Sequence, residues 1–274
     1  MRNMAPAAER EAASLSSAAN NSVSTMGMVT PIYEGGSRST LTDMGELLSP
    51  ARLGKRSELA RVIDHTLLKP TATSADIDLL CDEALRYNLW GVCVNPSHVK
   101  QAAQKLLGSG TVVCSVISFP LGSSTSDMKL MEARGAIADG AREIDMVSNI
   151  GALKSGDTRA YFADINEVAA FCGRSNTVLK VIIECCYLTD EEKVTAARLA
   201  EQAGANFVKT STGFGPGGAT AADVSLLRKV LANRTGVKAA GGIGTLAKAM
   251  EMISAGANRI GTSSGAKIIE ELPA

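Results

Sequence analysis

From about residue 62 onward, short apolar runs alternate with longer segments whose apolar residues recur at helical spacing. Eight runs can be counted, and the pattern predicts a buried strand at each of them. The predicted strands are 62–64, 91–95, 112–119, 143–147, 178–184, 207–211, 237–240 and 259–262. The main predicted helices lie between them, at 74–87, 129–139, 158–172, 191–203, 221–231 and 247–255. A short helix near Thr42 and a helical turn with Ser57 as its N-cap are predicted before the first strand.

This alternation indicates a parallel sheet with right-handed crossovers, and eight units of this length are what closure into a (β/α)8 TIM barrel requires. A chain of 274 residues suits one such α/β domain, because these barrels routinely contain about 250 residues. An open, doubly wound sheet is the competing architecture, since Gly242, Gly244 and Ala247 imitate a dinucleotide-binding motif. That motif falls at the seventh unit, and no ribose-binding acid ends a strand about 20 residues later, so we expect the single-domain barrel.

Residues 1–50 lack this pattern. They are rich in Ala, Ser, Asn and Gly, and we expect them to form a largely disordered, low-complexity extension to a barrel domain at residues 51–274. A transit peptide is the alternative, because arginines such as Arg2 and many serines are present. Acidic residues such as Glu9 are unusual in a transit peptide.

Charge and composition limit the classes of partner. Lysine plus arginine and aspartate plus glutamate number 28 each, so no net field attracts nucleic acid, and no basic run predicts a polyanion groove. The six cysteines include no C-x-x-C pair, which suits free thiols in a reducing cytoplasm. No segment approaches the ~20 apolar residues that span a bilayer. We therefore expect a soluble cytoplasmic protein with a small-molecule substrate and no nucleic-acid or membrane partner.

Several predicted strands carry charged residues, which are costly inside a barrel unless they are paired or functional. Barrel chemistry takes place at the carboxyl ends of the strands, so these side chains are candidate site residues. They are Asp64, Asp145, Lys180, Glu184, Lys209 and Lys238.

Lys209 is the strongest candidate for a nucleophile. Burial and a nearby second cation both lower the pKa of a lysine, and a neutral amine can attack a carbonyl group. Lys238, on the next predicted strand, could supply that cation, and Asp145 could pair with it and move protons through a water. The alternative is a structural network in which these three charges only neutralise one another.

Glycine-rich turns follow the sixth, seventh and eighth predicted strands, at Gly213, Gly241–Gly242 and residues 261–264. Backbone N–H groups at such turns bind phosphate, and the loops after strands seven and eight are the usual phosphate site of this fold. Each cluster alone is weak evidence, because turns need glycine for conformational reasons. Together, and beside two lysines, they favour a phosphorylated carbonyl substrate.

Metal chemistry is not favoured by the residues available. A zinc aldolase would use histidine ligands, but His65 and His98 are isolated and at no ligand spacing. Cys93 could face the pocket, although a buried structural thiol is the simpler interpretation. We therefore expect neither a metal nor a cofactor.

Taken together, these motifs resemble the deoxyribose-phosphate aldolase family from about residue 63 to residue 265. The similarity rests on segments 63–70, 91–96, 143–147, 179–184 and 209–213 and on the two glycine-serine turns near the end. The resemblance implies a metal-free class I aldolase that reversibly cleaves 2-deoxy-D-ribose 5-phosphate to D-glyceraldehyde 3-phosphate and acetaldehyde through a lysine Schiff base, in deoxyribose phosphate catabolism. It also implies a homo-oligomer, either a dimer or a tetramer.

The resemblance also implies roles for individual residues. Lys209 matches the Schiff-base lysine, Lys238 the lysine that depresses its pKa, and Asp145 the proton-relay aspartate. Asp64 and Lys180 match further polar residues that line the same pocket. The positions that match the phosphate site are Gly213, Gly241, Gly242, Ser263 and Ser264.

Two positions depart from the family pattern. Gly244 stands where the family often has arginine, and Phe214 stands where one branch of the family carries a lysine. Three rival functions stay open: a lysine aldolase for another phosphorylated sugar, a barrel that only senses sugar phosphates, and an isomerase. Gly244 keeps the sensor alternative open, whereas an isomerase would need a carboxylate base at a strand end without a reactive lysine.

Overall fold

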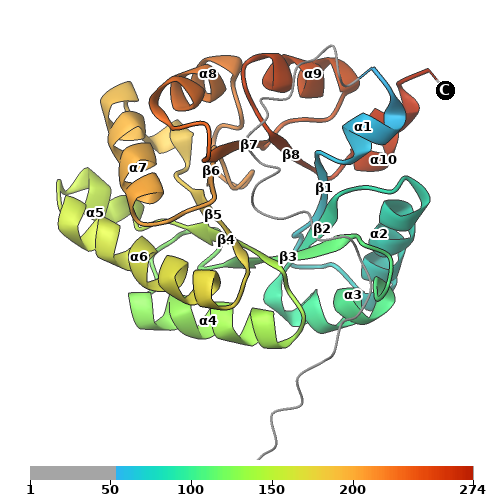
Figure 1. The fold of residues 1–274 in the computed structure, drawn as a ribbon, viewed down its shortest axis with the longest axis horizontal. Helices are drawn as coiled ribbons and strands as arrows, with labels where there is room; N and C mark the ends of the chain where they lie inside the picture. Colours follow the sequence, from blue (N-terminus) through green and yellow to red (C-terminus); the bar gives the residue numbers. More distant parts are fainter. Residues whose placement is uncertain (1–53, 274) are drawn as a thin grey trace, which may run out of the picture. The chain divides into compact units, whose positions relative to one another are not determined.

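The computed structural model describes residues 54–273. Eight parallel strands pair in chain order, and the last pairs with the first, so the sheet closes into a barrel (Figure 1). The strands are β1 (Ile63–Leu67), β2 (Gly91–Val94), β3 (Val112–Ile117), β4 (Glu143–Val147), β5 (Val178–Ile182), β6 (Phe207–Lys209), β7 (Gly236–Ala240) and β8 (Arg259–Thr262).

Helices surround the barrel and cover the outer face of the sheet (Figure 1). Within residues 54–273 the α-helices are α1 (Arg56–Ala60), α2 (Ser74–Arg86), α3 (Val99–Lys105), α4 (Ser126–Ala138), α5 (Ile150–Lys154), α6 (Thr158–Arg174), α7 (Asp190–Gln202), α8 (Ala221–Val230), α9 (Leu246–Ser254) and α10 (Gly265–Glu270). The same residues include the 3-10 helices η3 (Pro96–His98) and η4 (Cys185–Tyr187), which occupy loops after strands. Among residues 54–273, none of the helices combines the length and the apolar composition that a membrane-spanning segment needs.

Threonine begins many of the helices that return the chain to the sheet. A threonine side chain at the N-cap accepts a hydrogen bond from the backbone N–H three residues later, which satisfies a donor that the helix itself leaves free. Such threonines cap α2, α4, α7, α8 and α9. The caps at Thr73 and Thr189 are full capping boxes, in which Asp76 and Glu192 return a bond to the backbone of the cap.

The strands divide their side chains between two environments. In β4, Ile144 and Met146 pack in the main hydrophobic core with the helices. Glu143 and Asp145, which alternate with them along the strand, belong to a polar network. Because successive residues of a strand point to opposite faces, one face of β4 builds the outer core and the other faces the barrel interior. The position of the candidate site follows from this alternation.

The predicted eight-stranded barrel is confirmed, and its closure rules out an open sheet. The first strand continues to Leu67 rather than ending at Asp64. The prediction of Ser57 as an N-cap is wrong, because α1 begins at Arg56 and its cap is Lys55. A contact distant in sequence favours this start, since Arg56 Nε donates to the carbonyl oxygen of Leu272 at 2.7 Å.

The remaining predictions for the N-terminal region fall outside the described residues. These are the extension at residues 1–50, the boundary to the barrel domain, the transit-peptide alternative and the short helix near Thr42.

Candidate active site

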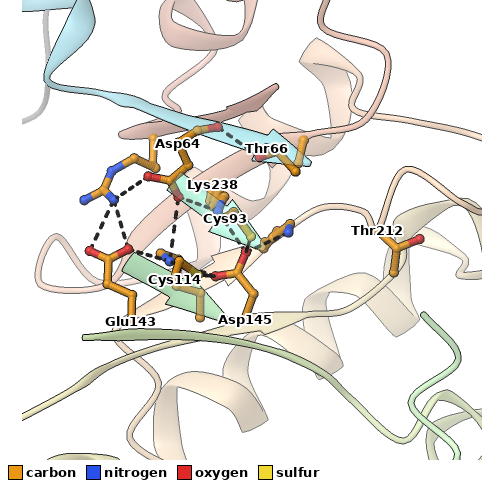
Figure 2. A network of polar contacts seen from close by, with 12 residues as sticks. Asp64, Thr66, Cys93, Cys114, Glu143, Asp145, Thr212 and Lys238 are labelled. Carbon is orange, nitrogen blue, oxygen red and sulfur yellow. Dashed lines mark hydrogen bonds and ion pairs between the residues drawn. The ribbon is translucent and has the colours of Figure 1, made fainter. Parts of the chain in front are cut away.

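Seven charged side chains form one buried network inside the barrel (Figure 2). None of them exposes more than 5 % of its surface. They are Asp64, Glu143, Asp145, Lys180, Lys209, Lys238 and Arg259. Strand register brings several of them together, because Asp145 is paired with Lys180 across β4 and β5 and Lys209 is paired with Lys238 across β6 and β7.

Asp145 lies at the centre of this network. Its Oδ2 lies 2.7 Å from Lys209 Nζ and 2.8 Å from Lys238 Nζ, and its Oδ1 lies 2.7 Å from Lys180 Nζ. Lys238 Nζ also forms a short ion pair with Asp64. Burial alone would raise the pKa of the Asp145 carboxyl, but the charges of the three lysines hold it well below its usual value.

A second group of contacts continues the network below Asp145. Arg259 Nη1 lies 3.0 Å from Asp64 Oδ1 and 3.2 Å from Glu143 Oε2, and Lys180 Nζ lies 2.6 Å from the same Glu143 oxygen. Trp90 Nε1 donates to Glu143 Oε1 at 2.9 Å, and its ring lies under the Arg259 guanidinium at 4.3 Å. Each of the three carboxylates in the network, Asp64, Glu143 and Asp145, therefore has a cation partner.

The charges of the network do not balance when every group is ionised. Three lysines and one arginine face three carboxylates. Lys209 contacts one carboxylate, Asp145, whereas Lys238 contacts two and Lys180 three. An unmatched buried charge costs free energy, so the Lys209 ammonium is the least supported of the four cations. With an uncharged Lys209, the network would contain three cations and three anions.

A cavity of about 470 Å³ opens above this network. Lys209 lines the cavity, and the other six members of the network do not. The remaining lining residues are Thr66, Leu67, Leu68, Lys69, Thr212, Gly213, Phe214, Ala240, Gly241, Gly242, Ile243, Gly244, Gly261, Thr262, Ser263 and Ser264. A molecule in the cavity would therefore meet the Lys209 side chain while the charged partners of that lysine lie deeper.

The five predicted phosphate-binding positions all line the same cavity, although they come from the loops after three different strands. Gly241 and Gly242 adopt φ angles of 91° and 76°, in the left-handed region that favours glycine. At the next turn, Ser264 donates its backbone N–H to Thr262 Oγ1 at 2.9 Å. Gly244, the position that departs from the family pattern, also lines the cavity.

Asp64 and Lys180 lie elsewhere than predicted. We expected both to line the pocket, but both belong to the buried network beneath it and contact other protein charges. Sequence reasoning also missed Arg259 as a site residue, and it did not single out Glu143. A signal for Glu143 was available, because it lies two residues before Asp145 and so shares its face of β4.

One group of side chains has the composition of a metal site. Ligand atoms of Cys93, Cys114 and Asp145 lie within 4.8 Å of one another (Figure 2). However, the Asp145 oxygens already accept from three lysines, and Lys180 Nζ also lies 3.3 Å from Cys114 Sγ. A metal cation would meet strong repulsion from these ammonium groups. Neither histidine belongs to this group.

The network predicts that acid destabilises the fold. Burial alone would raise the pKa values of Asp64, Glu143 and Asp145, but neighbouring cations lower all three. The unfolded chain binds protons at these carboxylates near pH 4, where the folded chain does not, so their stabilisation is present above about pH 4 and lost below it. Urea unfolding between pH 6 and pH 3 should show a falling midpoint below about pH 4. A midpoint that rises with acid would contradict this.

Comparison with known proteins supports the predicted resemblance. Residues 59–271 match the family model described as DeoC/LacD family aldolase. A deoxyribose-phosphate aldolase of Thermococcus gammatolerans is 56% identical over 215 residues, which cover 78% of this chain and 96% of that protein. One of Carboxydothermus hydrogenoformans is 54% identical over 218 residues, which cover 79% of this chain and 96% of that protein.

A solved structure agrees with these matches. A structure of deoxyribose phosphate aldolase from Aeropyrum pernix, described as tetrameric, aligns with a TM-score of 0.76 and 33% identity. The alignment covers 84% of this chain and 96% of that chain. The predicted family is thereby confirmed: this chain belongs to the DeoC/LacD family of aldolases.

Proposed function

We propose that this protein is a class I deoxyribose-phosphate aldolase, a carbon–carbon lyase of deoxyribose phosphate catabolism. It would cleave 2-deoxy-D-ribose 5-phosphate reversibly to D-glyceraldehyde 3-phosphate and acetaldehyde. The observation that carries the proposal is the placement of Lys209. Its amine contacts Asp145 in the buried charge network, and its side chain also lines the cavity. The names of relatives that are more than 50% identical over nearly their whole length support the substrate.

In the proposed reaction, the neutral Lys209 amine attacks the aldehyde carbon of the open-chain sugar. Loss of water from the resulting carbinolamine gives an iminium ion. As the C3 hydroxyl gives up its proton, the C2–C3 bond breaks and the iminium accepts its electron pair. This releases D-glyceraldehyde 3-phosphate and leaves an enamine on Lys209. Protonation of the enamine and hydrolysis then release acetaldehyde and restore the amine.

Asp145 and Lys238 would move the protons in these steps. Asp145 Oδ2 lies within hydrogen-bond distance of both Lys209 Nζ and Lys238 Nζ, so one carboxylate oxygen connects the proposed nucleophile to a second proton donor. The same carboxylate would stabilise the positive charge of the iminium. Because Lys238 also contacts Asp64, its own charge is supported when Lys209 is neutral.

The phosphate would bind at the glycine-serine wall of the cavity. Gly213, Gly241, Gly242, Ser263 and Ser264 come from three loops that converge on this wall. Backbone N–H groups and serine hydroxyls in such turns can bind an anion without a cationic side chain. Holding the phosphate there would fix the aldehyde end of the sugar near Lys209.

We also propose a cytoplasmic homo-oligomer, a dimer or a tetramer. All six cysteines of the chain are free thiols, which is consistent with a reducing compartment. The relative from Aeropyrum pernix is described as tetrameric, which supports self-association. Light scattering on the purified protein would measure its molar mass, and a monomer would contradict this part of the proposal.

The activity is tested by incubating the protein with 2-deoxy-D-ribose 5-phosphate and measuring D-glyceraldehyde 3-phosphate with a coupled dehydrogenase. Turnover that continues in the presence of a chelator is the expected result. Faster cleavage of another phosphorylated sugar would reassign the substrate. Thermal stabilisation by the sugar phosphate without release of aldehyde would indicate a sensor instead of an enzyme.

A further inference from the structure

Glu184 is a buried carboxylate outside the charged network. It follows β5 and exposes only 1 % of its surface. Among the ion pairs of residues 54–273, none includes Glu184, whereas Asp64, Glu143 and Asp145 all have cation partners. Its backbone is left-handed, with φ at 53° and ψ at 69°, a conformation that is unfavourable for a residue with a side chain. Both properties cost free energy, which points to a purpose for this side chain.

The Glu184 carboxylate is directed at Thr212, in the loop after β6. The Thr212 backbone N–H donates to Oε2 at 3.2 Å and to Oε1 at 3.3 Å, and the Thr212 hydroxyl donates to Oε2 in a short bond. The hydroxyl in turn accepts the backbone N–H of Phe214 at 3.0 Å. Glu184 is therefore hydrogen-bonded directly to Thr212, and the Thr212 hydroxyl connects it to the backbone of Phe214.

The backbone on both sides of Glu184 is attached to β6 and its extension. Ile183 donates its N–H to the carbonyl oxygen of Lys209 at 3.1 Å, and Cys185 donates to that of Thr210 at 2.8 Å. These bonds fix the backbone of Glu184 relative to the strand that carries Lys209. The contact with Thr212 therefore holds the loop after β6 in a fixed position relative to that strand.

The loop of residues 212–218 is held on its other side by the turn after β7. A Cβ atom at Gly218 would collide with the carbonyl oxygen of Gly241, so only glycine allows this approach. Ala219 donates its N–H to the same oxygen at 3.0 Å. The loop is thus fixed between Glu184 and Gly241, and its residues Thr212, Gly213 and Phe214 line the cavity.

The hydrogen-bond polarity explains why a carboxylate is needed. Thr212 N–H, Thr212 O–H and the Cys186 thiol, whose Sγ lies 3.7 Å from Oε1, are all donors. Two acceptor oxygens satisfy them, whereas a glutamine would place an NH2 group against one of these donors. Glu184 itself does not line the cavity, so any effect on a molecule in the cavity would pass through Thr212.

We propose that Glu184 is a positioning residue that holds the 212–218 loop in place as the phosphate-binding wall of the cavity. The inference rests on the proposed function for the identity of the substrate, while the contact itself does not depend on it. Loss of the contact should weaken binding of the phosphorylated sugar and leave the chemistry at Lys209 intact.

The test compares Glu184→Gln and Thr212→Val with the control Glu201→Gln. Glu201 also accepts from a backbone N–H (Ala232) and a threonine hydroxyl (Thr235), but it does not line the cavity. In the first two variants, KM for 2-deoxy-D-ribose 5-phosphate should rise about tenfold, with kcat within about threefold of wild type. For unphosphorylated 2-deoxy-D-ribose, kcat/KM should change less than about threefold. The Glu184→Gln/Thr212→Val double variant should match the single variants, because both remove one interaction. Glu201→Gln should show the wild-type KM and kcat.

A second measurement does not depend on turnover. Hydrogen–deuterium exchange should be faster across residues 212–218 in Glu184→Gln than in wild type, and unchanged there in Glu201→Gln. Equal exchange in Glu184→Gln and wild type would overturn the positioning role even if the protein cleaved no sugar phosphate. Equal losses of kcat/KM for the phosphorylated and unphosphorylated sugars would also overturn it. A wild-type protein that neither cleaves the substrate nor forms an adduct on Lys209 would instead overturn the proposed function.

Discussion

Replacing Lys209 with methionine is expected to lower kcat/KM for 2-deoxy-D-ribose 5-phosphate by at least about 10⁴-fold, since the variant lacks the proposed nucleophile. The folded protein should tolerate the change, because Lys209 is the cation with one carboxylate partner and its loss leaves three cations with three anions. Treatment with acetaldehyde and sodium borohydride, followed by peptide mass spectrometry, should place the reduced adduct on Lys209 in wild type and detect none in the variant.

The matched control is Lys129→Met. Lys129 is fully buried, and its Nζ lies 2.6 Å from Asp164 and 3.0 Å from the carbonyl oxygen of Val147, away from the cavity. This variant should melt at a lower temperature but still form the adduct on Lys209. An adduct on another lysine in wild type, or full activity in Lys209→Met, would reject the assignment.

Replacing Asp145 with asparagine is expected to damage both activity and stability. The amide has no charge, so four cations would face two carboxylates, and its NH2 group would be set against lysine ammonium groups. Removing one partner from a buried ion-pair network typically costs about 3–5 kcal/mol of unfolding free energy. Loss of the proposed proton relay should lower kcat by about 10²- to 10⁴-fold. Urea unfolding and steady-state kinetics measure the two effects.

The control variant Asp164→Asn distinguishes a loss of stability from a loss of catalysis. Asp164 is also buried and also pairs with a lysine. It belongs to α6, and its partner Lys129 belongs to α4, so this ion pair joins two helices instead of lying below the cavity. We expect a loss of stability similar to that of Asp145→Asn, with kcat per folded molecule unchanged. If both variants lost the same fraction of kcat, the effect of Asp145 would be attributed to folding rather than to proton transfer.

The periodicity of the chain was sufficient to predict the barrel and several of the charged residues that face its interior. Charged residues in otherwise apolar strands, such as Lys209 and Asp145, had to face either a partner or a cavity. The glycines that line the cavity followed predicted strands in a recognisable way. The short helices α3, α5 and α10 were not predicted, because five to seven residues give too little helical periodicity to recognise.

The depth of each side chain was harder to predict. Asp64 and Lys180 were expected in the pocket, but each strand is displaced along its neighbour around a closed barrel, so residues that look equivalent in sequence lie at different levels. The pairing of Arg259 with Glu143 and Trp90 also depends on that displacement, because these residues lie on or beside strands that are not neighbours in the sheet. Glu184 and its bonds to Thr212 depend on a local backbone conformation that no periodicity records.

Closure of the barrel determines when, during synthesis of the chain, the buried ion pairs can form. Arg259, on the last strand, pairs with Asp64, on the first strand, across 195 positions of the chain. Lys238 reaches the same aspartate across 174 positions. A chain emerging from the ribosome therefore cannot assemble these contacts until β8 has been synthesised and has joined β1. Shorter nascent chains would contain Lys209 without its complete electrostatic surroundings, so catalytic competence should arise only after the final strand closes the ring.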